Sequence, residues 1–280
     1  MENWKAIKNR IKTVSSIIKT MNSIKLVATI KLSRVNNINK CSKQCSDILF
    51  NMLLKAVDDC LFNEEFPDAW FNREKGKQLI LVLSTNQGFC GSLNQSIVTV
   101  ANELIRMHEG AYVEVFGKKG NEIPQNRAET TPLQEAAMHS VVGFSQYLTA
   151  LTVNYVLNHE VNEVFLVSGE HKSILVQNAR SLQLFPIDKE SANEKENVKI
   201  EGDRLKFLEE VFRMYLFELF KGLVTEHLVS EYSSRVMTMD NSVRNASDMF
   251  EKLKVLSNRI RQDKITQELT EIISSIECIR

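Results

Sequence analysis

The first sixty residues carry an apolar pattern that fits one long helix. Apolar residues recur at intervals of three and four, which is the 3.5-residue period of a coiled-coil seam. No proline or glycine occurs before Pro67, so a helix can run from about residue 3 to about residue 60, roughly 85 Å at 1.5 Å per residue. A helix of that length needs a partner along most of its extent. The seam consists of Trp4, Ile7, Ile11, Val14, Ile18, Met21, Ala28, Leu32 and Val35.

The C-terminal residues 203–280 repeat this pattern. They contain no proline and a single glycine, Gly222, so a second helix longer than the first is predicted. Two terminal seams in one chain pair most simply with each other, in antiparallel orientation; homodimerisation of each seam is the alternative. After a slip in register the second seam continues to its end. It consists of Met239, Val243, Ala246, Phe250, Leu253, Leu256, Ile260, Ile265, Leu269, Ile272 and Ile276.

The middle of the chain has a different pattern. Gln78–Thr85, Ala111–Gly117 and Val161–Ser168 have the apolar or alternating character of strands, and Ile97–His108 and Leu133–Asn158 have helical spacing. The order of strands and helices predicts a small, doubly wound, Rossmann-like α/β domain. The predicted fold is therefore α/β, with a long antiparallel coiled coil formed by the N- and C-terminal helices. The predicted segments are a helix at 1–60, a connector at 61–77, the α/β domain at 78–190, a charged linker at 191–202 and a helix at 203–280.

Composition excludes several classes of protein. With 280 residues, 43% of them apolar and 25% charged, the chain is a folded protein and not a disordered one. It has no apolar run of membrane-spanning length, no apolar signal core and no Arg/Ser-rich transit peptide at its start. We expect a bacterial or organelle-encoded protein that stays on the cytoplasmic side.

The charge is polarised although the net charge is zero. Residues 1–43 carry ten Lys and Arg and one acid, Glu2, for a net charge of +9, whereas residues 44–202 carry −8. A basic helix of this kind fits a nucleic acid, an anionic membrane surface or an acidic protein partner. Charge alone leaves these three open, although the absence of interleaved aromatic residues disfavours single-stranded nucleic acid.

The five cysteines indicate neither a disulfide framework nor a zinc site, because they are odd in number and form no C-x-x-C pair. We expect reduced thiols and no metal. Cys41 and Cys45 lie one helical turn apart, but the sequence offers no third ligand.

The turn Ser84–Asn94 is the strongest candidate for ligand binding. Its Gly88 and Gly91 precede a helix, as in turns that present backbone N–H groups to phosphate, yet the G-x-G-x-x-G spacing is absent. We expect a tight turn that seats a helix on the sheet, with Cys90 as a packed thiol. No catalytic constellation and no cofactor site is predicted. A nucleotide-binding α/β protein that uses the Gly88–Gly91 turn remains the alternative function.

The most specific motif lies in the last predicted helix. Arg261-Gln262, Ile265-Thr266, Glu268-Leu269 and Glu271-Ile272 resemble the R-Q-x-x-I-T-x-E-L-x-E-I signature of the gamma subunit family of F-type ATP synthase. Further segments resemble that family in the same order along the chain: 26–32, the turn 84–94, Gly117–Gly120 and Ser230–Arg235.

Three sites depart from the family pattern. Ile24 replaces a methionine that in the family lies against a catalytic subunit, Asn86-Gln87 replaces Asp-Arg, and Ser275-Ile276 replaces Gly-Ala. The resemblance is therefore to a divergent member.

The resemblance implies a non-catalytic rotor shaft. In the family, the coiled coil enters a ring of three alpha and three beta subunits, and the α/β domain meets the epsilon subunit and the membrane ring of c subunits. The shaft couples proton-driven rotation to ATP synthesis or hydrolysis in beta, on the cytoplasmic face of the bacterial inner membrane. By matching position, the residues implied to contact beta are Arg261, Gln262, Thr266, Glu268, Glu231, Arg235 and Ile24. A nucleotide enzyme and a coiled-coil scaffold on DNA or membrane are the competing classes.

Overall fold

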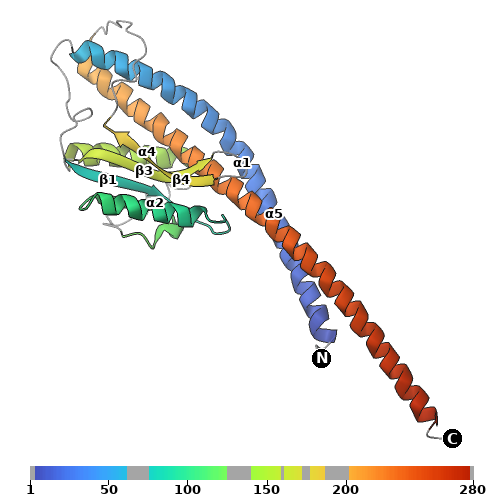
Figure 1. The fold of residues 1–280 in the computed structure, drawn as a ribbon. Coiled ribbons are helices and arrows are strands. Elements are labelled where there is room, and N and C mark those ends of the chain that lie inside the picture. The colour runs from blue at the N-terminus through green and yellow to red at the C-terminus, as the bar shows by residue number, and fades with distance from the viewer. Residues whose placement is uncertain are drawn as a thin grey trace. The chain divides into compact units, whose positions relative to one another are not determined.

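A computed structural model gives the fold (Figure 1). Most of the predicted connector 61–77 and of the predicted linker 191–202 falls outside the described residues, and the five-segment division of the chain remains a prediction. The structure describes residues 4–61, 76–124, 140–158, 161–171, 177–186 and 202–277.

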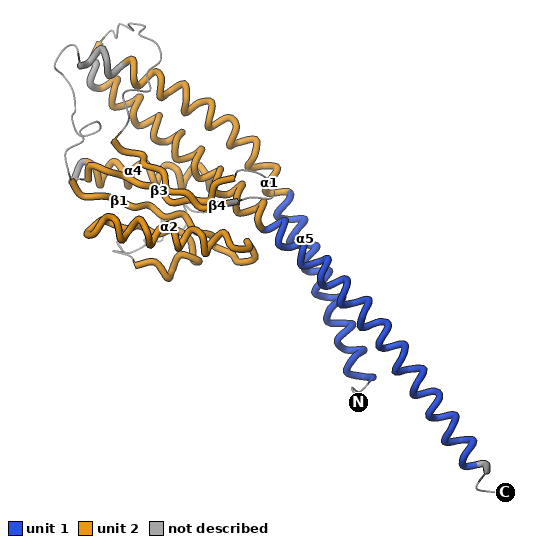
Figure 2. The backbone as a smooth tube through the Cα atoms, viewed as in Figure 1, with its two compact units in different colours: residues 1–29, 235–280 blue, residues 30–234 orange. Residues whose placement is uncertain are grey.

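The chain divides into two compact units, which Figure 2 distinguishes by colour. Unit 1 joins residues 1–29 to residues 235–280, and unit 2 comprises residues 30–234. Two long helices, α1 (Trp4–Leu61) and α5 (Arg204–Glu277), contribute to both units.

In unit 1, the two helices bury part of the predicted seam between them, whereas Leu256, Ile265, Leu269 and Ile272 of the predicted seam are exposed. Ile7, Val14 and Ala28 of α1 and Met239 of α5 are buried, and the Lys25 ammonium donates a hydrogen bond to the Asp240 carboxylate. Residues early in α1 therefore lie opposite residues late in α5, which is the antiparallel arrangement that the sequence predicted.

In unit 2, the same antiparallel pairing continues. The Thr225 hydroxyl donates to the Asn39 side-chain oxygen at 3.2 Å, and the ring centroids of Phe50 and Tyr215 are 5.5 Å apart. The α1 face toward α5 is built from small residues at its centre. Ser42 and Ser46 are buried there, so the two helix backbones approach closely.

The sheet of unit 2 has four strands in the order β2-β1-β3-β4. Their bounds are β1 (Lys77–Leu83), β2 (Tyr112–Phe116), β3 (Val161–His171) and β4 (Gln177–Phe185). β1 pairs in parallel with β2 and β3, as the sequence predicted, whereas β4 pairs antiparallel with β3 and was not predicted. β4 escaped the sequence because only its last two residues, Leu184 and Phe185, are buried, so it lacks an apolar pattern.

Helices cover both faces of the sheet (Figure 1). On one face, α2 (Leu93–Met107) packs Leu93, Ile97 and Ala101 against Ile80 and Val82 of β1. On the other face, α4 (Val141–Asn158) and α5 share a core with the alternate β1 residues. The strand order and the two-sided cover confirm the predicted α/β architecture, with α5 as a main part of the cover. That second core is centred on Leu79, Leu81, Leu148, Leu208, Leu216 and Phe220.

Candidate functional site

The glycine turn after β1 is held by its own polar groups. The Thr85 backbone N–H donates to the Asn94 side-chain oxygen at 3.3 Å, and the Asn94 amide donates to the Thr85 hydroxyl at 2.8 Å. Phe89 and Gly91 have positive φ angles of 64° and 56°, which turns the chain sharply before α2 begins. The buried Cys90 thiol donates to the Gly88 carbonyl at 3.4 Å, as expected for a packed thiol.

One face of α5 fills the space at the carboxyl end of the parallel strands, where α/β folds usually bind ligands. The His227 Nδ1 accepts a hydrogen bond from the Gly169 backbone N–H of β3 at 3.1 Å. The Ser234 hydroxyl donates to the Cys90 carbonyl at 2.5 Å, and the Ser230 hydroxyl donates to the Glu170 carbonyl at 3.4 Å. Three residues at the spacing of one helix face thus bond to β3 and to the glycine turn.

The packing at this edge leaves no room for a nucleotide beside Gly169. A Cβ atom on Gly169 would stand 2.9 Å from the Ser230 hydroxyl oxygen and 3.2 Å from a Leu93 methyl. Because α5 occupies the crevice that a dinucleotide would need, the geometry favours the tight-turn interpretation of the Gly88–Gly91 segment over the nucleotide-binding alternative.

Ion pairs fix α5 beside this edge. The Glu226 carboxylate lies 2.9 Å from the Lys43 ammonium of α1 and 3.6 Å from the Arg180 guanidinium of β4. Arg180 also bonds Glu170 of β3 at 3.2 Å. These charges link α1, the sheet and α5 within unit 2, so they have a structural role.

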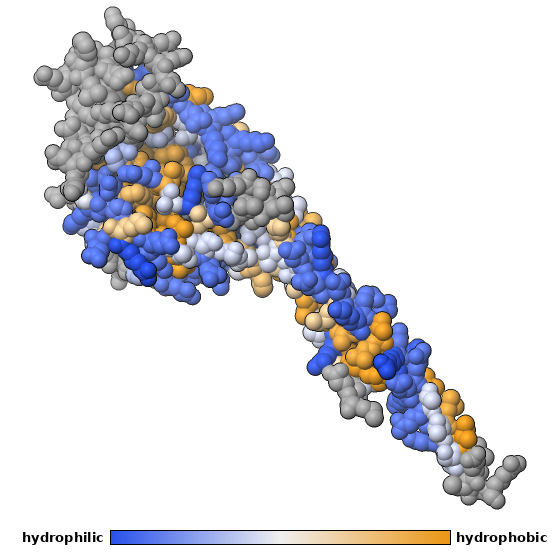
Figure 3. Space-filling view, in the orientation of Figure 1, coloured by the Kyte–Doolittle hydropathy of each residue, from blue (hydrophilic) through white to orange (hydrophobic). Residues whose placement is uncertain are grey.

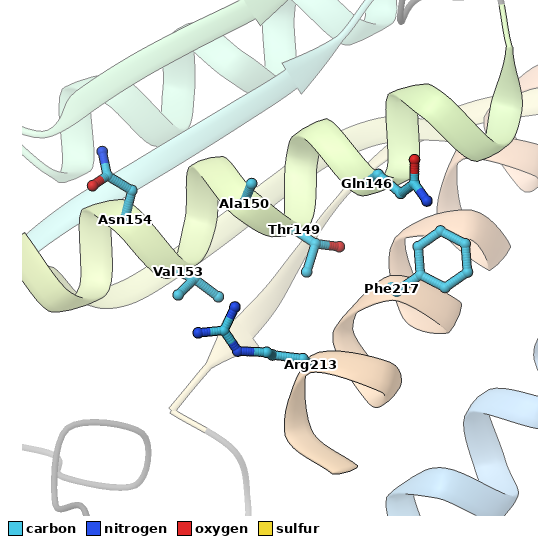
Figure 4. Close-up of a pocket in the computed structure, with 7 residues that line it drawn as sticks. All are labelled: Gln146, Thr149, Ala150, Val153, Asn154, Arg213 and Phe217. Carbon is cyan, nitrogen blue, oxygen red and sulfur yellow. The ribbon is translucent and has the colours of Figure 1, made fainter. Parts of the chain in front are cut away.

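A groove lies between α4 and α5 (Figure 4). Arg213 and Phe217 of α5 face the α4 residues Thr149 and Val153 across it. Arg213 is the only ionisable side chain among the residues that line the groove. Acid–base catalysis needs a matched acid or base beside it, and this lining supplies none.

The motif residues at the end of α5 lie on the surface. Arg261, Gln262, Thr266 and Glu268 are all exposed, as is every residue from 261 to 275. The Thr266 hydroxyl donates to the Gln262 carbonyl at 3.0 Å, and Glu268 lies 3.6 Å from Lys264 on the same helix. Exposed pairs of this kind contribute about 0–1 kcal/mol, so the side chains remain available to a partner.

The other predicted contact residues lie in different surroundings. Glu231 and Arg235 are buried, with 8% and 5% of their surface exposed, and Ile24 is half-buried on α1. The structure thus brings four of the seven predicted residues together on one exposed helix end and places the other three elsewhere. Contact with beta at these seven positions remains a prediction.

A charged cluster in unit 1 was not predicted from the sequence. Asp240 accepts a hydrogen bond from Lys25 and lies 2.8 Å from Arg244. The Lys25 hydrogen bond, with Arg244 nearby, lowers the pKa of the Asp240 carboxyl below its ordinary value. No local signal could have found this cluster, because Lys25 and Asp240 are separated by 215 positions.

The described part of the chain contains neither a metal-binding cluster nor a membrane-spanning helix. Among these residues, no group of three or more His, Cys, Asp or Glu side chains is placed to hold a metal ion. No described helix has the length and apolar content needed to cross a bilayer.

Comparisons with known proteins agree on one family. The sequence model of the family described as ATP synthase matches residues 3–279. The chain is 28% identical to the ATP synthase gamma chain of Campylobacter jejuni subsp. doylei and 29% identical to that of Geotalea uraniireducens, in both cases over 100% of each chain. The gamma chain of Clostridium novyi is 26% identical over 97% of this chain and 96% of its own length.

Solved structures show the same fold. A chain of the Euglena gracilis mitochondrial ATP synthase OSCP/F1/c-ring structure, rotational state 3, matches with a TM-score of 0.62 at 14% identity, covering 99% of this chain and 94% of that chain. A chain of the Euglena rotor structure in rotational state 1 has a TM-score of 0.59 at 15% identity, covering 94% and 98%. Together with the match over nearly the whole sequence, these findings show that the chain belongs to the ATP synthase family, as a non-catalytic member of the gamma type.

Proposed function

We propose that this chain is the central rotor shaft of an F-type ATP synthase. It couples proton-driven rotation of a ring of c subunits to ATP synthesis, or hydrolysis, in the beta subunits. The chemistry takes place in beta, and this chain contributes shape, stiffness and surface contacts. The match to the ATP synthase family over residues 3–279 supports this role.

The unpartnered end of α5 is the observation that carries the proposal. Lys25 lies opposite Asp240, so by the same antiparallel register Trp4, the start of α1, lies opposite roughly residue 261 of α5. The remaining turns of α5 have no α1 residue opposite them, yet Ile265, Leu269 and Ile272 are 49–55% exposed there. Figure 3 shows apolar side chains at the surface along the last part of α5. An apolar stripe that the described residues of this chain leave open fits a helix end that other subunits enclose.

The helix pair suits the transmission of torque. In unit 1 the pair buries Ile7, Val14 and Ala28 of α1 and Met239 of α5, and packed interiors deform little under load. Because the two helices differ in sequence, each side of the pair presents different residues to a surrounding ring. Rotation therefore changes which contacts each beta subunit meets, and differential contacts of this kind can bias distant catalytic sites.

The partners we infer are three alpha subunits, three beta subunits, the epsilon subunit and the c ring. The similar Euglena structures are of an OSCP/F1/c-ring assembly and of a rotor, which supports an assembly of this kind. The bacterial gamma chains among the relatives support the cytoplasmic face of the bacterial inner membrane, with membrane attachment only through the c ring.

Arg261, Gln262, Thr266 and Glu268 are the residues we infer to bond beta, and their exposure supports this assignment. Ile24 offers part of its surface to the same ring. Glu231 and Arg235 can add only the small part of their surface that is exposed.

Reconstitution tests the function. Purified alpha and beta from the same source are mixed with and without this chain, and ATP hydrolysis and native mass are measured. We expect a complex of three alpha, three beta and one copy of this chain, with hydrolysis that depends on the chain. If alpha and beta assemble with another gamma subunit but never with this chain, the proposal is wrong.

Arg261→Ala tests the contact role within the working complex. Loss of a charged hydrogen bond removes about 1.5–3 kcal/mol, so we expect ATP-driven proton pumping in vesicles to fall relative to hydrolysis. Arg259→Ala, an exposed arginine on the same helix but outside the motif, is the matched control. Equal pumping by both variants and the unmodified chain would rule out the role of Arg261.

A further inference from the structure

Two exposed thiols lie one turn apart on α1 within unit 2. Cys41 and Cys45 are free cysteines, both are exposed, and the helix runs unbroken past them. Residues four apart on a helix share one face, with Cβ atoms about 5–6 Å apart. Ser42, which approaches Gly222 of α5, and Ser46 are buried on the neighbouring face. The contact with α5 therefore leaves both thiols accessible.

The spacing is too long for the two thiols to join each other but fits one bridging atom. A disulfide needs Cβ atoms about 3.5–4.5 Å apart, which an intact helix does not offer at this spacing. Metal–sulfur bonds of about 2.3 Å, in contrast, hold two thiolate sulfurs up to about 4.6 Å apart. Two side chains whose Cβ atoms are separated by one helical turn reach such a position together. The pair therefore fits a site for a single metal ion.

The number of ligands decides which metals fit. Structural zinc takes four protein ligands, and among the described residues no group of three or more His, Cys, Asp or Glu side chains is placed to hold an ion. Thiolates are soft ligands that favour Cu(I), and this closed-shell ion binds two thiolates in a line without a third ligand. The missing third ligand, which argues against zinc, is thus no obstacle to Cu(I).

The charges around the pair favour a monovalent ion. Two thiolates with one Cu(I) carry a net charge of −1, whereas two thiolates with a divalent ion such as Hg(II) are neutral. Residues 31–55 hold five cations and one acid. The nearby Glu226 of α5 is already paired with Lys43 and Arg180. A cationic surface attracts an anionic complex and gains nothing from a neutral one, so it favours Cu(I).

We propose that Cys41 and Cys45 form a two-coordinate site for a thiophilic monovalent cation, Cu(I). Each thiol releases its proton to solvent and each sulfur forms one bond to the ion, so binding releases two protons and needs no oxidant or reductant. The inference is independent of the proposed function, because the site lies within a single stretch of α1.

Titration of the full chain tests the site. Cu(I) is added without oxygen, in competition with a coloured Cu(I) chelator, to a chain that carries Cys60→Ser and Cys278→Ser. This background leaves the pair and Cys90, which is buried. We expect one ion per chain, with two sulfur neighbours in the X-ray absorption spectrum. A hundredfold excess of Zn(II) should not displace the ion.

Matched variants test whether the spacing matters. Cys45→Ser removes one ligand and should lower the affinity for Cu(I) at least hundredfold. Adding Asn37→Cys to it restores two thiols four positions apart, one turn earlier, and should restore binding. Adding Asn51→Cys instead leaves the two thiols ten positions apart, roughly 15 Å along the helix, and should not. All of these positions are exposed, so the melting temperature should not change.

Several results would overturn the proposal. One is an affinity for Cu(I) that Cys45→Ser leaves unchanged, and another is equal binding by the Asn37→Cys and Asn51→Cys variants. Nitrogen or oxygen neighbours of the ion, or no binding in competition with the chelator, would do the same. None of these results bears on assembly with alpha and beta, which the reconstitution experiment tests separately.

Discussion

His227 of α5 makes the packing at the carboxyl end of the parallel strands sensitive to protonation. Its ring is buried and accepts a hydrogen bond from the Gly169 backbone N–H at 3.1 Å. Burial lowers the pKa of His227 to about 4, and the nearby Ser84 carbonyl, which favours the protonated ring, offsets only part of this effect. The neutral imidazole is therefore the form that the fold requires.

Acid should destabilise the protein through this residue. The unfolded chain binds a proton near pH 6.5 but the folded chain only near pH 4, so the free energy of unfolding falls as the pH drops from about 6.5 to about 4 and levels off below. The loss from His227 amounts to about 2 kcal/mol at pH 5. Urea unfolding at pH 7.5 and pH 5 measures it.

His227→Gln supplies the comparison. This variant should be less stable at pH 7.5 but should lose less stability on going to pH 5. His108→Gln, at the residue that follows α2, should keep the full acid loss. If His227→Gln and the unmodified chain lose the same stability between the two pH values, the buried neutral ring is not responsible.

Gly169 tests the packing of the crevice. Gly169→Ala would place a Cβ 2.9 Å from the Ser230 hydroxyl oxygen, so we expect a destabilisation of roughly 1–3 kcal/mol. Gly88→Ala is the control, since its Cβ would meet nothing closer than a Lys119 carbon at 3.8 Å. Thermal unfolding that ranks the two variants equally would show that α5 does not seal the edge as described.

The sequence indicated some of these residue roles and hid others. The lack of a G-x-G-x-x-G spacing correctly favoured a tight turn with a packed Cys90 thiol. His227, Ser230 and Ser234 gave no signal as occupants of the crevice, because their partners lie in the α/β domain, at distant positions of the chain. Local sequence patterns indicate the conformation that a residue prefers, whereas its tertiary contacts become visible only in the folded structure.

At the scale of elements, α1 and α5 followed from periodicity alone. Apolar residues at a 3.5-residue period, without proline, specify a helix and its buried face together. β4 was not predicted from the sequence. It is an edge strand that is buried at one end, so its sequence has little of the alternating apolar pattern by which strands are recognised. The start of α2 was predicted at residue 97 and is found at Leu93, since Leu93 continues the buried face of the helix.

The register of the two helices can be tested with a disulfide. Ser42 Cβ lies 3.9 Å from the Cβ position of Gly222, close to the separation of about 3.8 Å found in disulfides. In a Cys41→Ser background, Ser42→Cys with Gly222→Cys should oxidise readily within one chain, as mass spectrometry would detect. Ser46→Cys with Gly222→Cys, one helical turn out of register, should not. Equal oxidation of both pairs would indicate that the helices slide past each other.

At the scale of the whole molecule, the two compact units differ in how much of their apolar surface is buried. Unit 2 holds both apolar cores of the sheet, whereas unit 1 is a helix pair whose α5 end is exposed. The family resemblance read from the motifs was confirmed by the comparisons.

Fragments should reflect this difference. We expect residues 30–234 to fold cooperatively alone, because they contain every element of both cores. Residues 76–186, which lack α5, should remain largely unfolded, because one face of the sheet loses its cover. Circular dichroism melts of the two fragments check this, and cooperative melting of residues 76–186 would contradict it.

The cover that α5 gives to the sheet also has a consequence for synthesis. A ribosome releases the chain from its N-terminus, so all four strands emerge before Leu208, Leu216 and Phe220, which complete the core around Leu79 and Leu81. During that interval the apolar face of β1 has no helix from α5 to bury it. The nascent chain therefore exposes this apolar face until residue 224 has emerged from the ribosome.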